Sequence, residues 1–262
     1  MSFTAKDVMA LRQKTGMGMM DCKKALTEND GDAAAAVEWL RERMKGKMEE
    51  RTERATGEGR IGIAVDGSKA SIIEVQTETD FTARNEKFVE MVDDIVQMTM
   101  AQPAGDVSTD DAMDKRIDDV RLTTRENMSL TRGMRVDGGS FGSYVHHDGK
   151  RGVLLQLDGE APDDVKRGIC QHIVAMDPKG ISEADVDATV IEEVRAEAIQ
   201  EAKDTGKPEE IAGKIAEGRV KKYLAENTLL NQKYVLDESK SVQETLPSGV
   251  SVKQFIRYTL GG

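Results

Sequence analysis

The 262-residue chain has few cysteines and few aromatic residues. Its two cysteines, Cys22 and Cys170, are distant in sequence, and neither belongs to a Cys-x-x-Cys pair. This argues against a disulfide scaffold or a structural zinc site and suits a reducing cytosol. There are one Trp, four Tyr and five Phe, whereas methionine is abundant at 14 residues. The flexible methionine side chain suits adaptable protein contacts, and it equally suits the filling of helix cores.

Long apolar runs are also absent from the sequence. No uncharged run approaches the roughly 18 residues that a membrane-spanning helix requires. Residues 1–7 carry a carboxylate at Asp7 and lack the apolar stretch of a signal peptide. We therefore expect a soluble, cytoplasmic protein that does not insert into a membrane.

Positive charge is scarce relative to negative charge. The formal net charge is −11, and the basic stretch from Arg41 to Lys47 is followed at once by Glu49 and Glu50. Because nucleic-acid binding depends largely on Lys and Arg neutralising phosphates, direct binding of nucleic acid is not expected. An acidic chain more plausibly meets a protein partner, where its charge aids solubility and steering.

Two glycine motifs share letters with nucleotide-binding loops. Gly57-x-Gly59-x-x-Gly62 matches a dinucleotide-binding fingerprint, but that fingerprint needs a strand before it and a helix after it. Here a charged linker precedes the motif and a predicted strand follows it. Gly206-Lys207 lacks the upstream Gly and the following Ser or Thr of a P-loop. We therefore expect no cofactor and no nucleotide bound by the chain itself.

The histidines do not form a convincing metal site. His146 and His147 are adjacent on a predicted strand, so their side chains should point to opposite faces. His172, on a predicted helix, offers no compelling third ligand. No Ser, Cys or carboxylate stands beside a plausible base. We expect neither a metal site nor catalytic residues, and the chain is not predicted to be an enzyme.

Three short helices are predicted in the first fifty residues. Thr4 with Asp7 resembles a capping box, and a Thr-Gly-Met-Gly stretch ends the first helix. Two further helices are predicted at Met19–Leu26 and Ala33–Arg43. Because three short helices bury little surface, residues 1–50 are interpreted as a small satellite module.

After a predicted linker at 51–58, the pattern changes to alternating strands and helices. Two hairpins are predicted, at 61–75 around an Asp-Gly turn and at 144–157 around another. Helices are predicted at 82–100, 106–132 and Asp163–Met176. A hairpin followed by a helix, occurring twice, indicates an α+β core over 59–183 with antiparallel sheets.

Residues 184–226 predict two antiparallel helices joined by a tight reversal. Their apolar stripe is narrow and their other faces are charged, as in a helical hairpin that projects into solvent. The predicted seam consists of Ile191, Val194, Ala198, Ile211, Ile215, Val220 and Tyr223. The last segment, 227–262, regains β character, and both Tyr234–Leu236 and Phe255–Tyr258 are predicted to rejoin the core sheet.

The segment Glu78–Asn85 combines an aromatic residue with charged neighbours at the junction of a predicted strand and helix. In one interpretation, Asp80 caps the helix and Phe81 packs in the core. In the other, Phe81 is presented on a loop beside a charge, as many binding hot spots are. The residue pattern by itself leaves both interpretations open.

Six stretches of sequence carry a resemblance to a known family. They lie in the family's order along almost the whole chain: Leu11–Glu28, Glu78–Asn85, Gly142–His146, Gly206–Ala212, Glu217–Tyr223 and Leu230–Gln232. The first contains Thr-Gly-Met-Gly-Met-Met-Asp-Cys-Lys-Lys-Ala-Leu, and the second is Glu-Thr-Asp-Phe-Thr-Ala-Arg-Asn. The chain therefore resembles bacterial translation elongation factor Ts, a family that promotes GDP release from elongation factor Tu.

The resemblance implies an architecture and a set of partner contacts. It implies a ubiquitin-associated-like three-helix domain, a two-part antiparallel α+β core and a protruding coiled-coil hairpin. Met19 and Met20 correspond to residues on the partner-facing side of the N-terminal domain. His146 matches the family's histidine after Ser-Tyr-x, but the adjacent His147 leaves open which of the two residues makes that partner contact.

The resemblance also assigns a segment that approaches the partner's magnesium and phosphates. This segment consists of Thr79, Asp80, Phe81 and Thr82. The chain departs from many family members at Thr77, which replaces Cys, at Thr82, which replaces Val, and at Lys233, which replaces Pro. The expected partner is elongation factor Tu in its GDP-bound and nucleotide-free forms. A dimer through the core or the coiled coil is a further expectation.

Overall fold

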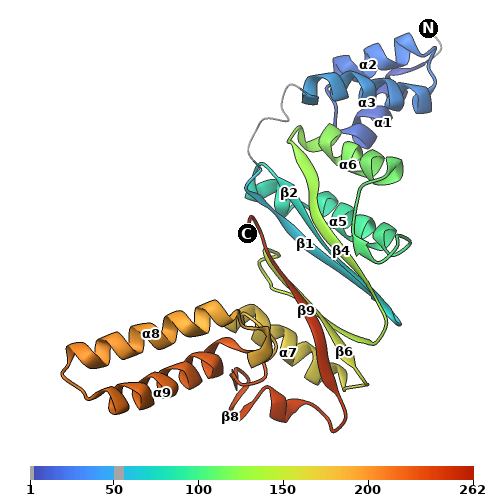
Figure 1. The fold of residues 1–262 in the computed structure, drawn as a ribbon. Helices are drawn as coiled ribbons and strands as arrows, with labels where there is room; N and C mark the ends of the chain where they lie inside the picture. The colour runs from blue at the N-terminus through green and yellow to red at the C-terminus, as the bar shows by residue number, and fades with distance from the viewer. Residues whose placement is uncertain (1–2, 50–55) are drawn as a thin grey trace. The chain divides into compact units, whose positions relative to one another are not determined.

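The computed structural model describes residues 3–49 and 56–262, and Figure 1 traces its helices and strands. The chain forms two compact units. The first comprises Met1–Asp137, His147–Gly152 and Tyr258–Gly262, and the second comprises Gly138–His146 and Val153–Arg257. The combination of helices with antiparallel strand pairs confirms the predicted α+β class.

The first unit begins with three helices: α1 (Ala5–Thr15), α2 (Met19–Glu28) and α3 (Ala33–Glu49). The predicted capping box is confirmed, because the Thr4 hydroxyl accepts from the Asp7 amide and the Asp7 carboxylate accepts from the Thr4 amide at 2.7 Å. Gly16 ends α1 with a left-handed φ of 67°, which glycine adopts without strain. α3 runs beyond its predicted end at Arg43, and part of the predicted linker lies outside the described residues.

A small apolar core holds the three helices together and extends to α6 (Asp111–Thr124). Its buried residues are Val8, Leu11, Met17, Cys22, Ala25, Leu26, Ala36, Val37, Leu40 and Leu122. Leu122 is the contribution of α6, and beside it the Nε of Arg41 donates to Asp119 at 2.9 Å. The N-terminal helices are therefore attached to α6 by apolar and ionic contacts together.

The sheet of the first unit has the strand order β1-β2-β4-β3. Its strands are β1 (Glu58–Asp66), β2 (Lys69–Thr77), β4 (Met128–Asp137) and the short β3 (Gly105–Asp106). All pairings are antiparallel, and β1 with β2 forms the first predicted hairpin. β1 begins at Glu58, within the stretch predicted as linker.

Two helices occupy the region predicted as one helix over 82–100. α4 (Asp80–Ala83) is a single turn, and α5 (Glu86–Thr99) starts after Asn85. The Asn85 side chain accepts from the Lys87 amide at 3.0 Å, so it caps α5 and separates it from α4. α5 packs against β1 and β2. Its buried face consists of Phe88, Met91, Val92, Ile95, Val96 and Thr99.

The prediction of helix throughout 106–132 is confirmed only for α6 and is wrong on both sides of it, since Asp106 belongs to β3. Arg125 takes a left-handed φ of 61° at the end of α6, and β4 follows. β4 was missed because arginines interrupt its apolar pattern. Arg132 pairs with Glu74 of β2 at 2.7 Å, and Arg135 is buried within the strand. Ion pairing lets such residues lie in a sheet although periodicity reads the segment as polar.

The second unit contains most of the sheet β5-β6-β9. The strands are β5 (Ser140–Val145), β6 (Arg151–Asp158) and β9 (Ser251–Thr259). α7 (Asp163–Met176) covers the residues predicted for it and shares an apolar core with β6. The prediction that Phe255–Tyr258 joins this sheet is confirmed by β9. Two 3-10 turns also occur, η1 (Glu183–Asp185) and η2 (Gln243–Thr245).

The prediction that Tyr234–Leu236 rejoins the core sheet is wrong. β7 (Lys233–Tyr234) and β8 (Asp237–Ser241) pair with each other in a separate two-stranded sheet. Tyr234 is buried in the apolar core, whereas Val235 and Leu236 form the exposed turn between the two strands. An apolar run of this length predicts a strand, but it does not identify the strand with which it pairs.

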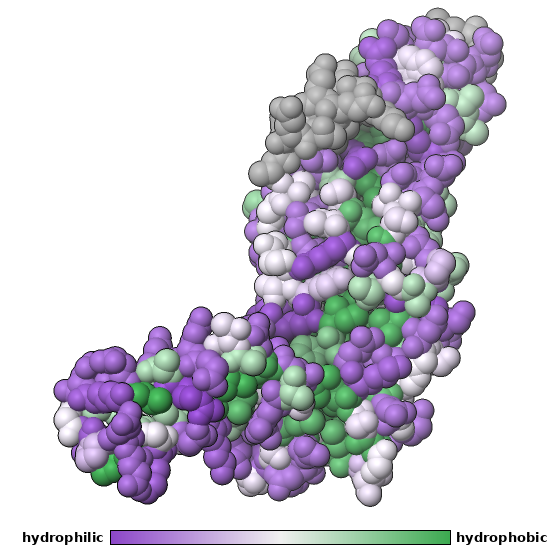
Figure 2. All heavy atoms as spheres, viewed as in Figure 1, coloured by the Kyte–Doolittle hydropathy of each residue, from purple (hydrophilic) through white to green (hydrophobic). Residues whose placement is uncertain are grey.

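Two long helices, α8 (Ala188–Asp204) and α9 (Glu209–Asn227), form a helical hairpin (Figure 1). Its visible surface is mostly hydrophilic (Figure 2). The buried residues of the two helices are Ala198, Ala202, Ala212, Ala216, Val220 and Leu224. The predicted seam is confirmed at Ala198 and Val220, which are buried, and it is wrong at Ile211 and Ile215, which are 45% and 40% exposed. Alanine occupies the seam because small side chains allow close helix packing.

Ala216→Asp is expected to open the helical hairpin locally. The new carboxylate would lie between α8 and α9 among apolar side chains, where an unpaired charge is costly. We expect amide exchange in both helices to rise about tenfold or more, measured by hydrogen-exchange mass spectrometry. Ile215→Asp, at the exposed neighbouring position, is the matched control and should leave exchange unchanged. Simultaneous loss of protection in α7 and β6 would contradict a separable hairpin.

Candidate functional site

The segment Thr79–Thr82 lies between the end of β2 and the start of α5. Thr79 is the N-cap of α4, and its hydroxyl oxygen accepts from the Thr82 amide at 3.3 Å. Asp80 is the first residue of the helix, so the interpretation of Asp80 as the cap is wrong. Threonine is a favoured cap because its side-chain oxygen satisfies an amide that has no partner within the helix. This contact fixes the shape of the turn.

Phe81 is presented at the surface by this turn. Its exposed fraction is 84%, whereas Thr82 and Ala83 directly after it are buried. The interpretation of Phe81 as a core residue is therefore wrong. An exposed phenyl ring contributes little to the stability of its own fold, but it offers a large apolar surface to a partner.

The charge next to Phe81 belongs to Asp80 and Arg84, which form an ion pair at 3.3 Å. Their side chains are 41% and 76% exposed. Exposed ion pairs contribute at most about 1 kcal/mol, so this pair can exchange partners at little cost. The Asp80 carboxylate is thus accessible to polar groups of a bound protein.

Glu126, which was not predicted from the sequence, binds the segment through its carboxylate. Its carboxylate accepts from the Thr79 hydroxyl at 2.7 Å, the Thr79 amide at 3.1 Å and the Thr77 hydroxyl at 3.0 Å. The neighbouring Asn127 amide donates to Glu78 at 2.7 Å. No sequence signal pointed to Glu126, because it lies in a polar stretch far from the segment along the chain.

The electrostatic setting of Glu126 favours the ionised carboxylate. Burial is the strongest influence and raises its pKa, but hydrogen bonds from the hydroxyls of Thr79, Thr82 and Thr77 and from the Thr79 amide act in the opposite direction. Their sum outweighs burial, so the pKa of Glu126 is lowered. The carboxylate therefore acts as an acceptor for several donors of the segment at once.

A second candidate surface lies on the N-terminal helices. Met19 and Met20 are 45% and 74% exposed, which confirms that the Gly-rich turn before them leaves methionine at the surface. Met19 also borders a largely apolar hollow of about 390 Å³. The hollow is lined by Phe3, Thr4, Ala5, Val8, Met9, Met19 and Lys23. Flexible methionines around an apolar depression suit contact with another protein.

His146 and His147 lie in the turn that follows β5, so the prediction that both lie on a strand is wrong. His146 is half-buried, with its Nδ1 3.1 Å from the hydroxyl of Tyr144, whereas His147 is exposed. β5 ends before them because the chain turns at Asp148 and Gly149, where the glycine takes a φ of 73°. This turn belongs to a different element from α4 and from α2, which carries Met19 and Met20.

His172 is a structural residue of α7. Its Nε2 lies 2.9 Å from the side-chain oxygen of Gln232, and its Nδ1 accepts from the Val235 amide at 3.1 Å. Burial lowers the pKa of His172, the larger influence, while the Gln232 contact raises it. A neutral ring with both nitrogens occupied links α7 to the β7–β8 turn.

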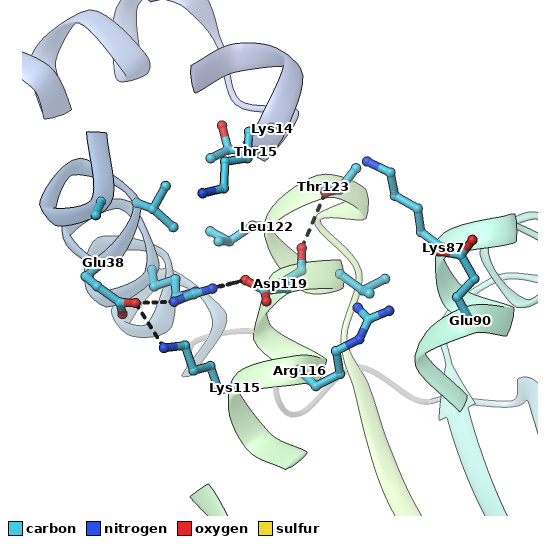
Figure 3. A pocket seen from close by; sticks show the side chains of 14 residues that line it. Lys14, Thr15, Glu38, Lys87, Glu90, Lys115, Arg116, Asp119, Leu122 and Thr123 are labelled. Atoms are coloured by element: carbon cyan, nitrogen blue, oxygen red, sulfur yellow. Dashed lines mark hydrogen bonds and ion pairs between the residues drawn. The ribbon is translucent and has the colours of Figure 1, made fainter. Parts of the chain in front are cut away.

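A polar hollow of about 450 Å³ lies between the N-terminal helices and α6 (Figure 3). Among the cations that line it, Arg41, Lys115 and Arg116 are paired with neighbouring carboxylates. Arg41 pairs with Glu38 and Asp119, and Lys115 pairs with Glu38 at 3.3 Å. These pairs join α3 to α6, so the hollow serves the attachment of the N-terminal helices.

Within residues 3–49 and 56–262, no group of three or more His, Cys, Asp and Glu side chains is arranged to hold a metal ion. In the same residues, no helix combines the length and the apolar character needed to span a membrane.

Comparison with known proteins assigns the chain to a family. A model of the family described as Elongation factor TS matches residues 78–262. The chain is 39% identical over 272 residues to Elongation factor Ts of Ruegeria sp. (strain TM1040), covering 100% of this chain and 93% of that protein. Elongation factor Ts of Dinoroseobacter shibae (strain DSM 16493 / NCIMB 14021 / DFL 12) is also 39% identical, with the same coverage.

These matches define the class as translation elongation factors. The chain belongs to the elongation factor Ts family. It is accordingly a guanine-nucleotide exchange factor for elongation factor Tu, as the resemblance of its sequence predicts.

Proposed function

We propose that Phe81, on the turn Thr79–Thr82, is the residue that disturbs the magnesium and phosphate region of elongation factor Tu. The observation that carries this proposal is an 84% exposed phenylalanine on a turn that is capped by Thr79 and held by Glu126. The segment combines an apolar ring, Phe81, with a carboxylate, Asp80, beside it. Together these two groups are suited to displacing a hydrated cation from its site. Loss of magnesium removes a large positive charge that faces the phosphates, and GDP then leaves faster.

The energetics require more contact than one side chain supplies. An exchange factor binds the nucleotide-free partner more tightly than the GDP-bound partner, and the coupling is reciprocal. Weakening a nucleotide site about 10⁴-fold requires about 5.5 kcal/mol of differential affinity. Burial of one phenylalanine supplies about 1.5–3 kcal/mol. Phe81 therefore acts together with other contact surfaces.

The N-terminal helices supply the docking contact in this proposal, as a ubiquitin-associated-like domain. Met19 and Met20 enter an apolar surface of the partner, and this contact keeps Phe81 close to the nucleotide site. The turn at His146 and His147 adds a polar contact. The hairpin α8–α9 acts as a coiled coil, either as a secondary contact or in a dimer.

The experiment that tests the exchange function is the release of fluorescent GDP from elongation factor Tu. Substoichiometric amounts of the chain should accelerate release. Excess unlabelled GDP should compete with the fluorescent GDP for the emptied site. The affinity for nucleotide-free elongation factor Tu is measured in parallel. A binding module would form the complex without changing the rate of GDP release, and this result would overturn the proposal.

Met19→Gln combined with Met20→Gln is expected to weaken the complex with elongation factor Tu about tenfold or more. Glutamine keeps the length and the helix propensity of methionine but removes the apolar surface. Because both residues are exposed, the free protein should keep its stability. Affinity is measured by titration of the nucleotide-free partner.

Lys24→Gln, an exposed position on the same helix, is the control for the methionine variants and should bind normally. At saturating concentrations of the methionine double variant, the rate of GDP release should recover only in part, because the methionine contact supplies some of the differential affinity that Phe81 alone lacks. Unchanged affinity of the double variant would rule out this docking surface.

A further inference from the structure

We propose that Glu126 is a positioning residue for Phe81: its carboxylate fixes the turn Thr79–Thr82 and so sets where the ring is presented. This inference rests on the proposed function of Phe81. Glu126 lies beneath the turn, half-buried, and makes its contacts with Thr77 and Thr79. It therefore acts on the partner through another residue.

The first step is the chain of hydrogen bonds that joins Glu126 to the turn. The Thr79 hydroxyl donates to Glu126 Oε1 at 2.7 Å and accepts from the Thr82 amide at 3.3 Å. One hydroxyl therefore serves both as the helix cap and as the link to the carboxylate. Without its acceptor, the hydroxyl is free to rotate, and the cap of α4 weakens.

The second step is the anchoring of Glu126 itself. Arg125 ends α6 with a left-handed φ of 61° and turns the chain so that Glu126 faces the end of β2. Directly after this turn, Met128 of β4 pairs with Thr77 of β2. Glu126 thus lies in the short connection 125–127, directly between the end of α6 and the start of β4.

A second hydrogen bond joins the same two segments with donor and acceptor exchanged. The Asn127 amide donates to the Glu78 carboxylate at 2.7 Å, while the carboxylate of Glu126 accepts from Thr79. The segment and the α6–β4 junction therefore hold each other on both sides. The turn around Phe81 is therefore already ordered before the partner binds. Binding energy is not spent on ordering the turn and remains available to change the partner.

A carboxylate fits this place better than an amide. Both oxygens of Glu126 accept, Oε1 from the Thr79 hydroxyl and Oε2 from the Thr77 hydroxyl and the Thr79 amide. Bonds to an ionised acceptor are shorter and stronger than neutral ones. Glutamine has nearly the same shape but turns an NH2 group towards one of these donors, which leaves that donor without an acceptor.

The test is a double-mutant cycle with Glu126→Gln and Phe81→Ala in the full chain with elongation factor Tu. Glu126→Gln alone should slow GDP release from the saturated complex about fivefold and change affinity for the nucleotide-free partner less than twofold. In the Phe81→Ala background, Glu126→Gln should have no further effect on release. Amide exchange at residues 79–85 should rise in Glu126→Gln.

Glu90→Gln, the same substitution at an exposed position of α5, is the control and should release GDP at the wild-type rate. A release rate that Glu126→Gln lowers equally with and without Phe81 would overturn the positioning role, as would a wild-type rate in a folded Glu126→Gln protein. A wild-type rate in Phe81→Ala would instead overturn the proposed function, so the two failures are distinguishable.

Discussion

Phe81→Ala is expected to slow the release of GDP from elongation factor Tu by about ten- to a hundredfold at saturating concentrations of the exchange factor. In the proposed function the ring is buried against the partner, and such burial supplies about 1.5–3 kcal/mol, while each 1.36 kcal/mol changes a rate tenfold. The ring is 84% exposed in the free protein, so its removal should shift the melting temperature by no more than about 2 °C. Stopped-flow release of fluorescent GDP and thermal unfolding are the two measurements.

Two further variants separate the role of the ring from general apolar surface. Phe81→Leu keeps part of the apolar volume and should lie between Phe81→Ala and the wild type. Val65→Ala removes another exposed apolar side chain, at the end of β1, and should leave the release rate unchanged. A folded Phe81→Ala protein that releases GDP at the wild-type rate would show that the ring is not the active element.

The elements that sequence reasoning found are those whose signals are local. The capping box of Thr4 and Asp7, the first β-hairpin and α7 each have a short motif or a period that identifies them. The exposed methionines follow from a Gly-rich turn that must lie at the surface. Each of these signals depends on neighbouring residues, so a single sequence suffices to find it.

The elements that were missed depend on partners distant in sequence. β4 carries Arg132 and Arg135, and it reads as polar until Glu74 is known to lie opposite Arg132. The seam of α9 uses Ala216 instead of the more apolar Ile215, because close packing selects for small volume over hydrophobicity. The periodicity of a sequence reflects only hydrophobicity. It therefore reveals neither a cross-strand ion pair nor a preference for small side chains.

The candidate site divides in the same way. The residues that face outwards, Asp80 and Phe81, stand in a contiguous motif and were found from the sequence. Thr79 belongs to the same motif, but its role as the helix cap and its bond to Glu126 were not found, because Glu126 reaches it from the distant α6–β4 junction. A functional motif thus identifies what is presented to a partner, while the structure identifies what holds it in place.

Arg132→Leu is expected to lower the stability of the first unit by about 3 kcal/mol. Arg132 pairs with Glu74 at 2.7 Å, and the Glu74 side chain is 1% exposed. Removing one partner of a buried pair costs about 3–5 kcal/mol because it leaves a buried charge uncompensated, and the partial exposure of Arg132 favours the lower end. The midpoint of urea unfolding and amide exchange in β2 and β4 are the measurements.

The same substitution should loosen the C-terminal residues. Arg132 donates to the Thr259 carbonyl at 2.9 Å and lies over the ring of Tyr258, 4.3 Å from its centroid, while the Gly261 amide donates to Glu74 at 3.1 Å. Arg132→Lys keeps the charge but loses the planar stacking and the second donor, so its cost should be intermediate.

The double variant Glu74→Leu with Arg132→Leu tests whether the ion pair adds to the stability of the fold or only compensates the buried charge of Glu74. Two apolar side chains at directly paired positions of β2 and β4 leave no buried charge behind. Replacement of a buried pair by apolar residues is often neutral, so most of the loss in Arg132→Leu should be recovered. If the double variant is as unstable as Arg132→Leu, the loss comes from the other contacts of the two side chains, namely those of Arg132 with Tyr258 and Thr259 and those of Glu74 with Gln76 and Gly261. The bond from Gly261 to Glu74 is lost in the double variant only, and exchange of the Gly261 amide therefore reports on the C-terminal attachment separately from the pair.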